Sequence, residues 1–294
     1  MKLTLLSLFL LIALASKAQS YSGPESAEYD AANNRWLIAN TTSHEVIARS
    51  STGTLSVFVG GLGSGPHGIE IVGDTLFCCS GASIKGYLLS NASQVFNLNL
   101  GATFLNGITH DNSGNLIATG FTAKKIFKVN ISAQTFSTIA TTLVQSPNGI
   151  VFDAANNRCV FVNWGSSAPI KAIDMTTYAV TTLLTTAFSN CDGISRDAQG
   201  RYYVSNWGGQ SIVRYDSAFS LAPATVVTGL SNPADIFYNT LDDTLAIPNA
   251  GNNTVTFFGF ATSTGIDETK TEEMLNVFPN PATNKLTIEN GHLK

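Results

Sequence analysis

The sequence is poor in charge and in cysteine. Only 12% of its residues are charged, the formal net charge is −4 at pH 7, and no basic run occurs. This composition argues against nucleic acid or an anionic membrane surface as a partner. The four cysteines lack CxxC spacing and are too few for a disulfide scaffold. We expect them to be buried small residues, with a bridge between Cys159 and Cys191 as the alternative.

Two further absences limit the chemistry and the location. No GxSxG motif occurs, and no Ser, His and Asp set has a recognisable spacing, so we expect no nucleophilic triad. The only long apolar run, Leu3 to Ala15, is too short to span a bilayer with ease and precedes a small-residue cleavage site ending at Ala18. We therefore predict a signal peptide over 1–18, with an uncleaved anchor as the alternative, and a mature chain without membrane insertion.

What the sequence does contain is one short phrase repeated six times. "PNGIVFDAANNRCVFVNWG" at 147–165 is echoed by "CDGISRDAQGRYYVSNWGG" at 191–209. Related phrases begin at Pro24, Pro66, Leu105 and Pro233, so the six starts lie 39 to 44 residues apart. A repeat of this period is typical of solenoids and propellers.

Within each repeat the apolar residues alternate with period two, in short runs separated by turn residues. Four short antiparallel strands per repeat are typical of one propeller blade. We therefore predict an all-β protein with a six-bladed β-propeller over 19–262. The sixth repeat supplies three strands, so either its blade is three-stranded or part of 261–266 completes it.

Beyond the propeller we predict a linker over 263–275, because the composition turns to Thr, Ser, Gly, Asp and Glu from Ala261 to Glu273. The stretch 276–294, "NVFPNPATNKLTIENGHLK", resembles the opening of the β-sandwich-type C-terminal sorting domain of type IX secretion cargo. Such domains continue further, so we expect only part of one here. The resemblance implies export through the periplasm by the type IX machinery, to the cell surface or the medium.

Closing the ring would bring six equivalent inner-strand positions around one axis. These axial residues are Glu25, His67, Asn106, Asn148, Asp192 and Ala234. The second strand of each blade returns to the same face, which predicts a second polar ring of Asn40, Ser80, Thr119, Asn163, Asn206 and Asn249. Carboxylate and amide oxygens suit a hard divalent cation. We predict Glu25, Asn148 and Asp192 as its ligands; the alternative is that these side chains are merely solvated in the channel mouth.

The motifs around these residues resemble the regucalcin/gluconolactonase family, also called LRE-like. They are Glu25-Ser26, Asn106-Gly107, "PNGIVFD" and "CDGISRDAQGRYYVSNWGGQSIVRYD". The resemblance implies one divalent ion, calcium first with zinc, manganese and magnesium as alternatives, held by Glu25, Asn148 and Asp192. It also implies that Asn106 binds substrate or a metal-bound water, and that Asp192 is the general base of lactone hydrolysis.

Two positions depart from the family pattern. Sugar-lactone members carry an Arg two residues before the substrate-binding Asn, where this chain has Phe104. This departure argues against aldonolactone substrates. The first family motif also runs Glu-x-Pro, whereas Glu25 is followed by Ser26 and Ala27, which weakens the alignment there.

Three further residues are candidates for the pocket. His67, in "GPHGI", also resembles propeller lyases related to the NHL repeat, but a lone axial histidine does not make a multi-histidine zinc site. We expect His67 to line the pocket. Trp164 and Trp207 follow the second ring and are predicted to stack on a sugar-like ligand, with blade packing as the alternative.

The sequence thus predicts a secreted monomer that acts as a metal-dependent hydrolase of small lactone-like or ester substrates. Two alternatives stay open. One is a non-enzymatic NHL-like binding module at the cell surface, and the other is a propeller lyase. Fold alone does not choose between them, because propellers host many functions.

Overall fold

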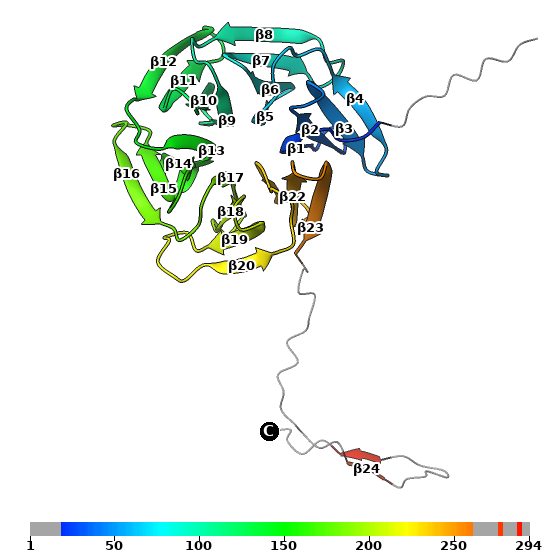
Figure 1. The fold of residues 1–294 in the computed structure, drawn as a ribbon. Coiled ribbons are helices and arrows are strands. Elements are labelled where there is room, and N and C mark those ends of the chain that lie inside the picture. The colour runs from blue at the N-terminus through cyan, green and yellow to red at the C-terminus, as the bar shows by residue number, and fades with distance from the viewer. Residues whose placement is uncertain (1–18, 261–275, 279–286, 290–294) are drawn as a thin grey trace, which may run out of the picture. The chain divides into compact units, whose positions relative to one another are not determined.

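The computed structural model describes residues 19–260, 276–278 and 287–289 (Figure 1). Contacts divide the chain into two units, residues 1–260 and 261–294, which are described separately below. The predicted signal peptide 1–18 and linker 263–275 lie outside the described residues. In the described part of the chain, no helix is long and apolar enough to cross a membrane.

Residues 24–259 form six antiparallel sheets arranged radially around one axis (Figure 1), which confirms the predicted all-β, six-bladed propeller. The first three blades contain β1 (Pro24–Asp30), β2 (Arg35–Asn40), β3 (Glu45–Ser50) and β4 (Leu55–Val59); β5 (Ile69–Val72), β6 (Thr75–Ser80), β7 (Ser83–Leu88) and β8 (Gln94–Asn99); and β9 (Leu105–His110), β10 (Asn115–Gly120), β11 (Lys125–Asn130) and β12 (Thr135–Ala140). The last three contain β13 (Ser146–Asp153), β14 (Arg158–Trp164), β15 (Pro169–Asp174) and β16 (Val180–Thr185); β17 (Cys191–Arg196), β18 (Tyr202–Asn206), β19 (Ser211–Tyr215) and β20 (Ala224–Val227); and β21 (Phe237–Asn239), β22 (Thr244–Asn249) and β23 (Thr254–Gly259).

An aspartate at the end of the inner strand fixes the first hairpin in several blades. In blade 4, Asp153 accepts hydrogen bonds from Asn156 Nδ2 at 2.8 Å and Arg158 Nε at 2.9 Å, around the short 3₁₀ turn Ala154–Asn156. In blade 1, Asp30 accepts from Arg35 Nε at 2.8 Å in the same way. This local pairing explains why the string "DAANNR" occurs in both blade 1 and blade 4.

The hydrophobic core is divided into six clusters, one between each pair of neighbouring blades. Each blade therefore buries both faces. Cys78 packs toward blade 1 and Cys79 toward blade 3, because successive strand residues point to opposite faces. All four cysteines are buried and free, which confirms the prediction of small core residues and excludes the Cys159 to Cys191 bridge.

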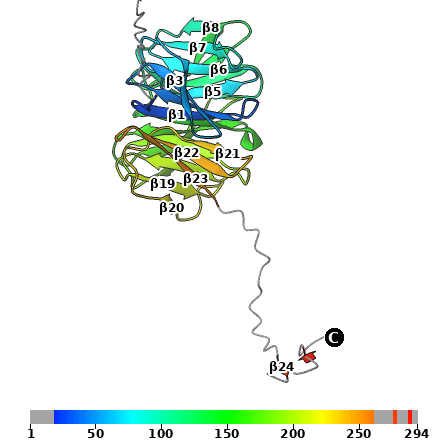
Figure 2. The same cartoon turned by 90° about the vertical axis from the view of Figure 1, so that its right-hand side faces the viewer.

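Within the described residues, packing rather than a shared strand closes the ring between blades 6 and 1. Trp36 lies 5.1 Å from Phe257 and 6.1 Å from Phe237, measured between ring centroids. The Asp235 N–H donates to the Glu25 carbonyl oxygen at 2.7 Å, and β1 lies alongside β22 (Figure 2). Blade 6 has three strands within the described residues. Residues 261–266, the predicted source of a fourth strand, lie outside them.

The second unit is described only at two short strands. β24 (Asn276–Phe278) and β25 (Thr287–Glu289) pair antiparallel, with Asn276 opposite Glu289. The "PNPA" motif at 279–282 and the following Leu286 lie outside the described residues, so the sorting domain stays a prediction.

Glycine sets the distance between the inner strands. A Cβ atom on Gly107 would lie 2.5 Å from the Asn148 carbonyl oxygen, and one on Gly149 would lie 2.7 Å from the Asp192 carbonyl oxygen. Neither glycine has a positive φ angle. These residues are therefore required because neighbouring backbones meet there, and the axial side chains are drawn together as a result.

We expect Gly107→Ala to lower the free energy of unfolding by about 1–3 kcal/mol, because a methyl group there forces two blade backbones apart. The matched control is Gly259→Ala on β23, where a Cβ meets nothing within 4 Å. The check is the melting temperature of both variants, at about 2–4 °C per kcal/mol for a domain of this size. Equal melting temperatures would contradict the close-approach role.

Candidate functional site

A β-bulge at the start of each functional inner strand turns the axial side chain out of the sheet. In blade 4 the pairing jumps from Pro147 opposite Asn163 to Ile150 opposite Phe161. The residues between the paired positions are Asn148 and Gly149. Blade 5 has the same jump around Asp192, blade 3 has it around Asn106, and blade 1 has a smaller one around Glu25. Bulges commonly re-aim side chains beside active sites.

Hydroxyl groups satisfy the backbone that the bulges release. Thr119 Oγ1 accepts from the Gly107 N–H at 2.8 Å and lies 2.8 Å from the Asn148 carbonyl oxygen of the next blade, to which it donates. Ser205 Oγ accepts from the Gly193 N–H at 2.6 Å. The bulges are therefore fixed, which holds the axial side chains in place.

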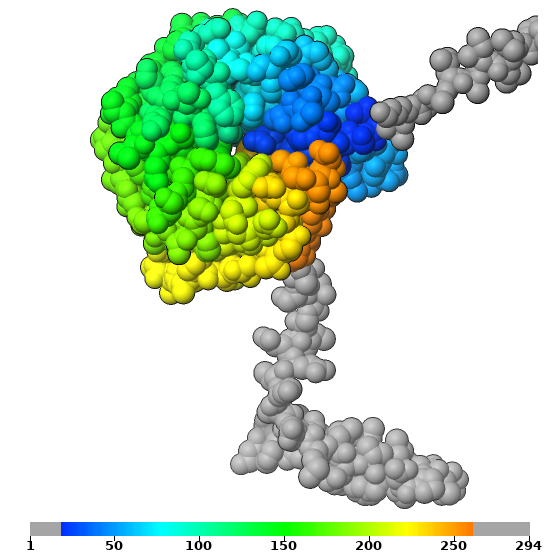
Figure 3. Space-filling model, viewed as in Figure 1, coloured from blue at the N-terminus to red at the C-terminus, as the bar shows by residue number. Residues whose placement is uncertain are grey.

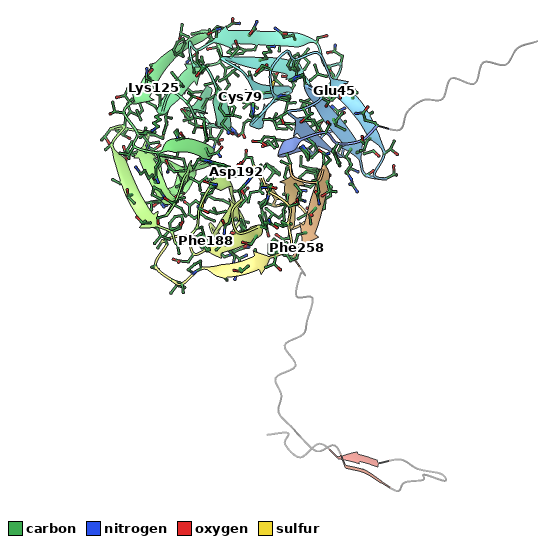
Figure 4. All side chains as sticks on the ribbon, in the orientation of Figure 1. Glu45, Cys79, Lys125, Phe188, Asp192 and Phe258 are labelled. Atoms are coloured by element: carbon green, nitrogen blue, oxygen red, sulfur yellow. The ribbon has the colours of Figure 1, made fainter. Side chains whose placement is uncertain are left out.

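The axial side chains form the floor of a cavity of about 200 Å³ at one mouth of the channel. Its floor is Glu25, Asn106, Asn148 and Asp192, and its remaining lining is aromatic. The space-filling view shows the molecule hollowed at the centre of the ring (Figure 3), and Asp192 lies beside the axis (Figure 4). The structure thus brings together the four residues that the sequence singled out for metal and substrate.

Three oxygen atoms on this floor are buried without a hydrogen-bond partner. They are Asn106 Oδ1, Asn148 Oδ1 and Asp192 Oδ1, on side chains that are 4%, 1% and 3% exposed. A buried polar atom without a partner costs free energy, and such atoms in native structures call for an explanation. Their convergence on one cavity indicates a ligand that accepts electron pairs or donates hydrogen bonds.

The floor also holds two buried carboxyl groups without a basic partner among the described lining residues. Burial raises the pKa of Glu25 well above its usual range, and the nearby Asp235 carboxylate adds to the rise. Burial likewise raises the pKa of Asp192, with further contributions from Glu25 and Asp235. No Lys or Arg is among the described residues that line the cavity. Without a cation, the pair is therefore driven toward its protonated form.

This donor set fits a hard divalent cation. Two carboxylates and two amide oxygens are ligands that calcium and magnesium accept, and all four lie in one cavity. Among the described residues, no three His, Cys, Asp or Glu side chains converge as a metal site. A cation here would therefore depend on Asn106 and Asn148 as well as on the two carboxylates, which disfavours softer metals.

His67 contacts a lining residue of the cavity without lining the cavity itself. It is not among the lining residues, and its ring packs edge-on against Phe104 with 4.4 Å between centroids. Burial lowers the pKa of His67 to about 4, so the imidazole is neutral at physiological pH. In this arrangement the histidine supports Phe104.

The second polar ring has a structural role in this arrangement. Asn40 Oδ1 accepts from the Ser22 N–H at 2.8 Å, Asn163 Nδ2 donates to the Pro169 carbonyl at 2.8 Å, and Asn206 Oδ1 accepts from the Gly209 N–H at 3.0 Å. None of the six residues of this ring lines the cavity. Asn163 and Asn206 close the turns that follow their strands, whereas Asn40 holds the segment before β1.

Four aromatic residues, here called the aromatic wall, cover the cavity: Phe104, Phe121, Trp164 and Trp207. None of them belongs to the hydrophobic clusters between blades, but Trp164 contacts the rings of Phe121 in blade 3 and Trp207 in blade 5. The sequence analysis noted Phe104 only as a departure and did not include Phe121. The available signal for Phe121 was its place just after β10, close to the position that Trp164 takes at the end of β14.

A second cavity of about 160 Å³ is lined by residues of all six blades that follow the axial positions along the chain. Three acidic residues missed by the sequence analysis, Glu28, Glu70 and Asp235, are among those lining it. Asp235 accepts a hydrogen bond from Ser26 Oγ at 3.2 Å, and burial raises its pKa to about 7. Asp235 occupies the repeat position held by glycine in blades 2 to 5, a signal that was present in the sequence.

The fold defines the chain as a six-bladed β-propeller. No protein-family model matches it, and no curated protein matches it in sequence. Among solved structures it is similar to a chain of the nidogen/laminin complex, with a TM-score of 0.70 and 15% identity over 79% of this chain and 92% of that chain. It is also similar to a calcium-binding protein, regucalcin, from Agrobacterium tumefaciens, with a TM-score of 0.65 and 15% identity over 82% of this chain and 91% of that chain.

A third similar structure is an auxiliary nutrient binding protein from Bacteroides thetaiotaomicron, with a TM-score of 0.66 and 12% identity over 81% of this chain and 70% of that chain. At these identities the likeness shows the fold alone.

We expect the chelated protein to lose stability as pH rises from about 4 toward 8. Folding raises the pKa of Asp192 above its ordinary value of 3.8, so the folded state binds more protons and its stability falls as pH rises above that value. Asp192→Asn removes one of the buried charges. Its melting temperature in chelator should therefore exceed that of the wild type by a few degrees at pH 8 and by less at pH 4.

The control is Asp242→Asn, which changes an exposed carboxylate. Its melting temperature should follow that of the wild type at every pH. A lower melting temperature for Asp192→Asn at pH 8 in chelator would contradict the assignment of buried, uncompensated charge.

Proposed function

We propose that the protein is a metal-dependent hydrolase of small lactone-like or ester substrates. The observation that carries the proposal is the convergence of Glu25, Asn148 and Asp192 with Asn106 on one cavity floor, with three of their oxygens unpartnered. Glu25, Asn148 and Asp192 would hold one divalent cation. Calcium is proposed first because all the donors are oxygens, and magnesium, manganese and zinc are the alternatives.

Such a cation, when bound, polarises a substrate carbonyl and stabilises the negative charge that develops on its oxygen. With the cation bound, Asp192 would be ionised rather than in the protonated form that burial alone favours. The ionised carboxylate is then able to act as a general base.

In the proposed reaction Asp192 accepts a proton from a water molecule as the water oxygen attacks the carbonyl carbon. The bond between that carbon and the ring or ester oxygen then breaks. The same proton passes from Asp192 to the departing oxygen, so the products are a carboxylic acid and an alcohol. Asn106 holds the substrate or the water beside Asp192, and the aromatic wall limits the entry of other water.

Two resemblances support this proposal. The motifs around Glu25, Asn106, Asn148 and Asp192 resemble those of the regucalcin/gluconolactonase family, and the regucalcin from Agrobacterium tumefaciens, which is described as calcium-binding, has the same fold. The absence of a GxSxG motif is in keeping with chemistry in which water, rather than a protein nucleophile, attacks the substrate.

A non-enzymatic binding module is the second candidate. It is favoured by similar propellers in the nidogen/laminin complex and in a nutrient binding protein. In that case the same cavity would capture a ligand without converting it.

We also propose that a signal peptide and the type IX machinery export the protein, and that it acts as a monomer at the cell surface or in the medium. This part rests on the two terminal sequence patterns. It is tested by locating the mature chain in cell fractions with and without that secretion system, where retention of the wild-type pattern without the system would contradict it.

The hydrolase proposal predicts a saturable rise in melting temperature when calcium is added to the chelated protein. A rise equivalent to about 2.7 kcal/mol is expected at one hundred times the dissociation constant. Asp192→Asn should abolish this rise and lower turnover of lactones and esters by about a hundredfold or more. Asp242→Asn, on the surface, should leave both unchanged.

Three results separate the candidates. Turnover retained by Asp192→Asn would contradict the proposed base. No thermal shift with any of the four metals would contradict the cation site. A metal-dependent thermal shift without turnover of any lactone or ester would favour the binding module.

A further inference from the structure

The aromatic wall is continuous. Phe104 and Phe121 lie 5.2 Å apart, Phe121 and Trp164 lie 6.1 Å apart, and Trp164 and Trp207 lie 5.6 Å apart, all measured between ring centroids. The residues come from four separate segments, of blades 2–3, 3, 4 and 5. One side of the mouth is therefore lined with aromatic rings.

The wall is a surface rather than a core. All four rings are partly exposed, and none packs in the clusters that hold the blades together. The His67 ring packs edge-on against Phe104, the first ring of the wall, with 4.4 Å between centroids. Partly exposed aromatic rings over a polar floor are typical of small-molecule sites, where apolar walls bind the ligand and few polar groups orient it.

The charge of the cavity limits the ligand. The charged side chains among its described lining residues are Glu25 and Asp192, both acidic. An anionic substrate would lack a cationic partner from the chain. A polyhydroxylated substrate would also meet few side-chain donors, since Phe104 stands on the wall where sugar-lactone members carry an Arg.

The size of the cavity suits a compact ring system. It measures about 200 Å³, somewhat more than the roughly 150 Å³ of an apolar cavity that holds one benzene molecule. A single aromatic ring with a small fused or attached lactone or ester group is of this order.

We propose that the substrate is an uncharged lactone or ester bearing an aryl or similarly flat apolar group. That group lies against Phe121 and Trp164, and the carbonyl points to the floor at Asn148 and Asp192. This assignment of substrate class rests on the proposed function, and its test separates binding from chemistry.

The first measurement is binding of 3,4-dihydro-2-quinolinone, the hydrolysis-resistant lactam analogue of dihydrocoumarin, to the calcium-loaded full chain. Titration calorimetry gives the affinity, and tryptophan fluorescence reports the wall. Two of the three tryptophans, Trp164 and Trp207, line the cavity, while Trp36 is buried between blades 6 and 1. We expect the aryl lactam to bind at least tenfold more tightly than gluconolactam and to change the fluorescence.

Phe121→Ala and Trp164→Ala should each weaken aryl lactam binding about tenfold, because each removes one aromatic contact. Phe136→Ala is the matched control, since Phe136 is an exposed aromatic residue on β12 away from the cavity. Melting temperatures verify that each variant is folded. Unchanged binding in both wall variants would overturn the proposal.

Phe104→Arg tests selectivity from the other direction. It should weaken binding of the aryl lactam and strengthen binding of gluconolactam. The ratio of the gluconolactam dissociation constant to that of the aryl lactam should therefore fall at least tenfold. Gluconolactam binding to the wild type as tightly as the aryl lactam would overturn the proposed substrate class, whatever the turnover.

Hydrolysis of dihydrocoumarin and glucono-δ-lactone is then measured on the same samples. Faster turnover of dihydrocoumarin, lost in Asp192→Asn, is expected. Tight, wall-dependent binding of the aryl lactam without hydrolysis of dihydrocoumarin would overturn the hydrolase and leave the ligand class in place. Efficient hydrolysis of glucono-δ-lactone alone would overturn the ligand class and leave the hydrolase in place.

Discussion

The close approach of inner-strand backbones at glycine is the constraint on which the rest of the structure depends. Where Gly107 and Gly149 stand, a single methyl group would meet the backbone of the next blade. This contact makes the channel narrow. A narrow channel brings the residues before the glycines within reach of one cavity, and the bulges turn their side chains into it. Packing between blades and the chemistry at the axis therefore share one geometric cause.

That geometry leaves polar groups in a state that folding alone does not favour. Burial raises the pKa of both Glu25 and Asp192, Asp235 raises both further, and Glu25 adds to the rise at Asp192. No basic side chain among the cavity's described lining compensates them. The unpartnered oxygens of Asn106 and Asn148 add to the cost. A bound cation would remove both penalties at once, which is why the floor supports a ligand site more strongly than any single residue does.

The six blades share a backbone but differ at the positions that face the mouth. Directly after the second-ring residue, blades 4 and 5 have Trp164 and Trp207, whereas blades 1 and 6 have Thr41 and Ala250, and blade 3 has Phe121 one residue further along. The cavity is consequently asymmetric, with an aromatic side and an acidic floor. Different side chains at or near equivalent positions of the blades therefore allow a symmetric scaffold to orient a substrate. The hydrogen bonds that hold the ring do not have to change.

The sequence alone determined the six blades and the identity of the axial residues, because these depend on a local repeat with period two and on the residue beside each glycine. Only the tertiary structure decided that Cys159 and Cys191 are free, that Phe104 and Phe121 form one surface with the tryptophans, that His67 packs against Phe104, and that second-ring residues such as Asn206 close turns. Those relations join segments some forty residues apart, and they depend on blade packing, which no local pattern encodes.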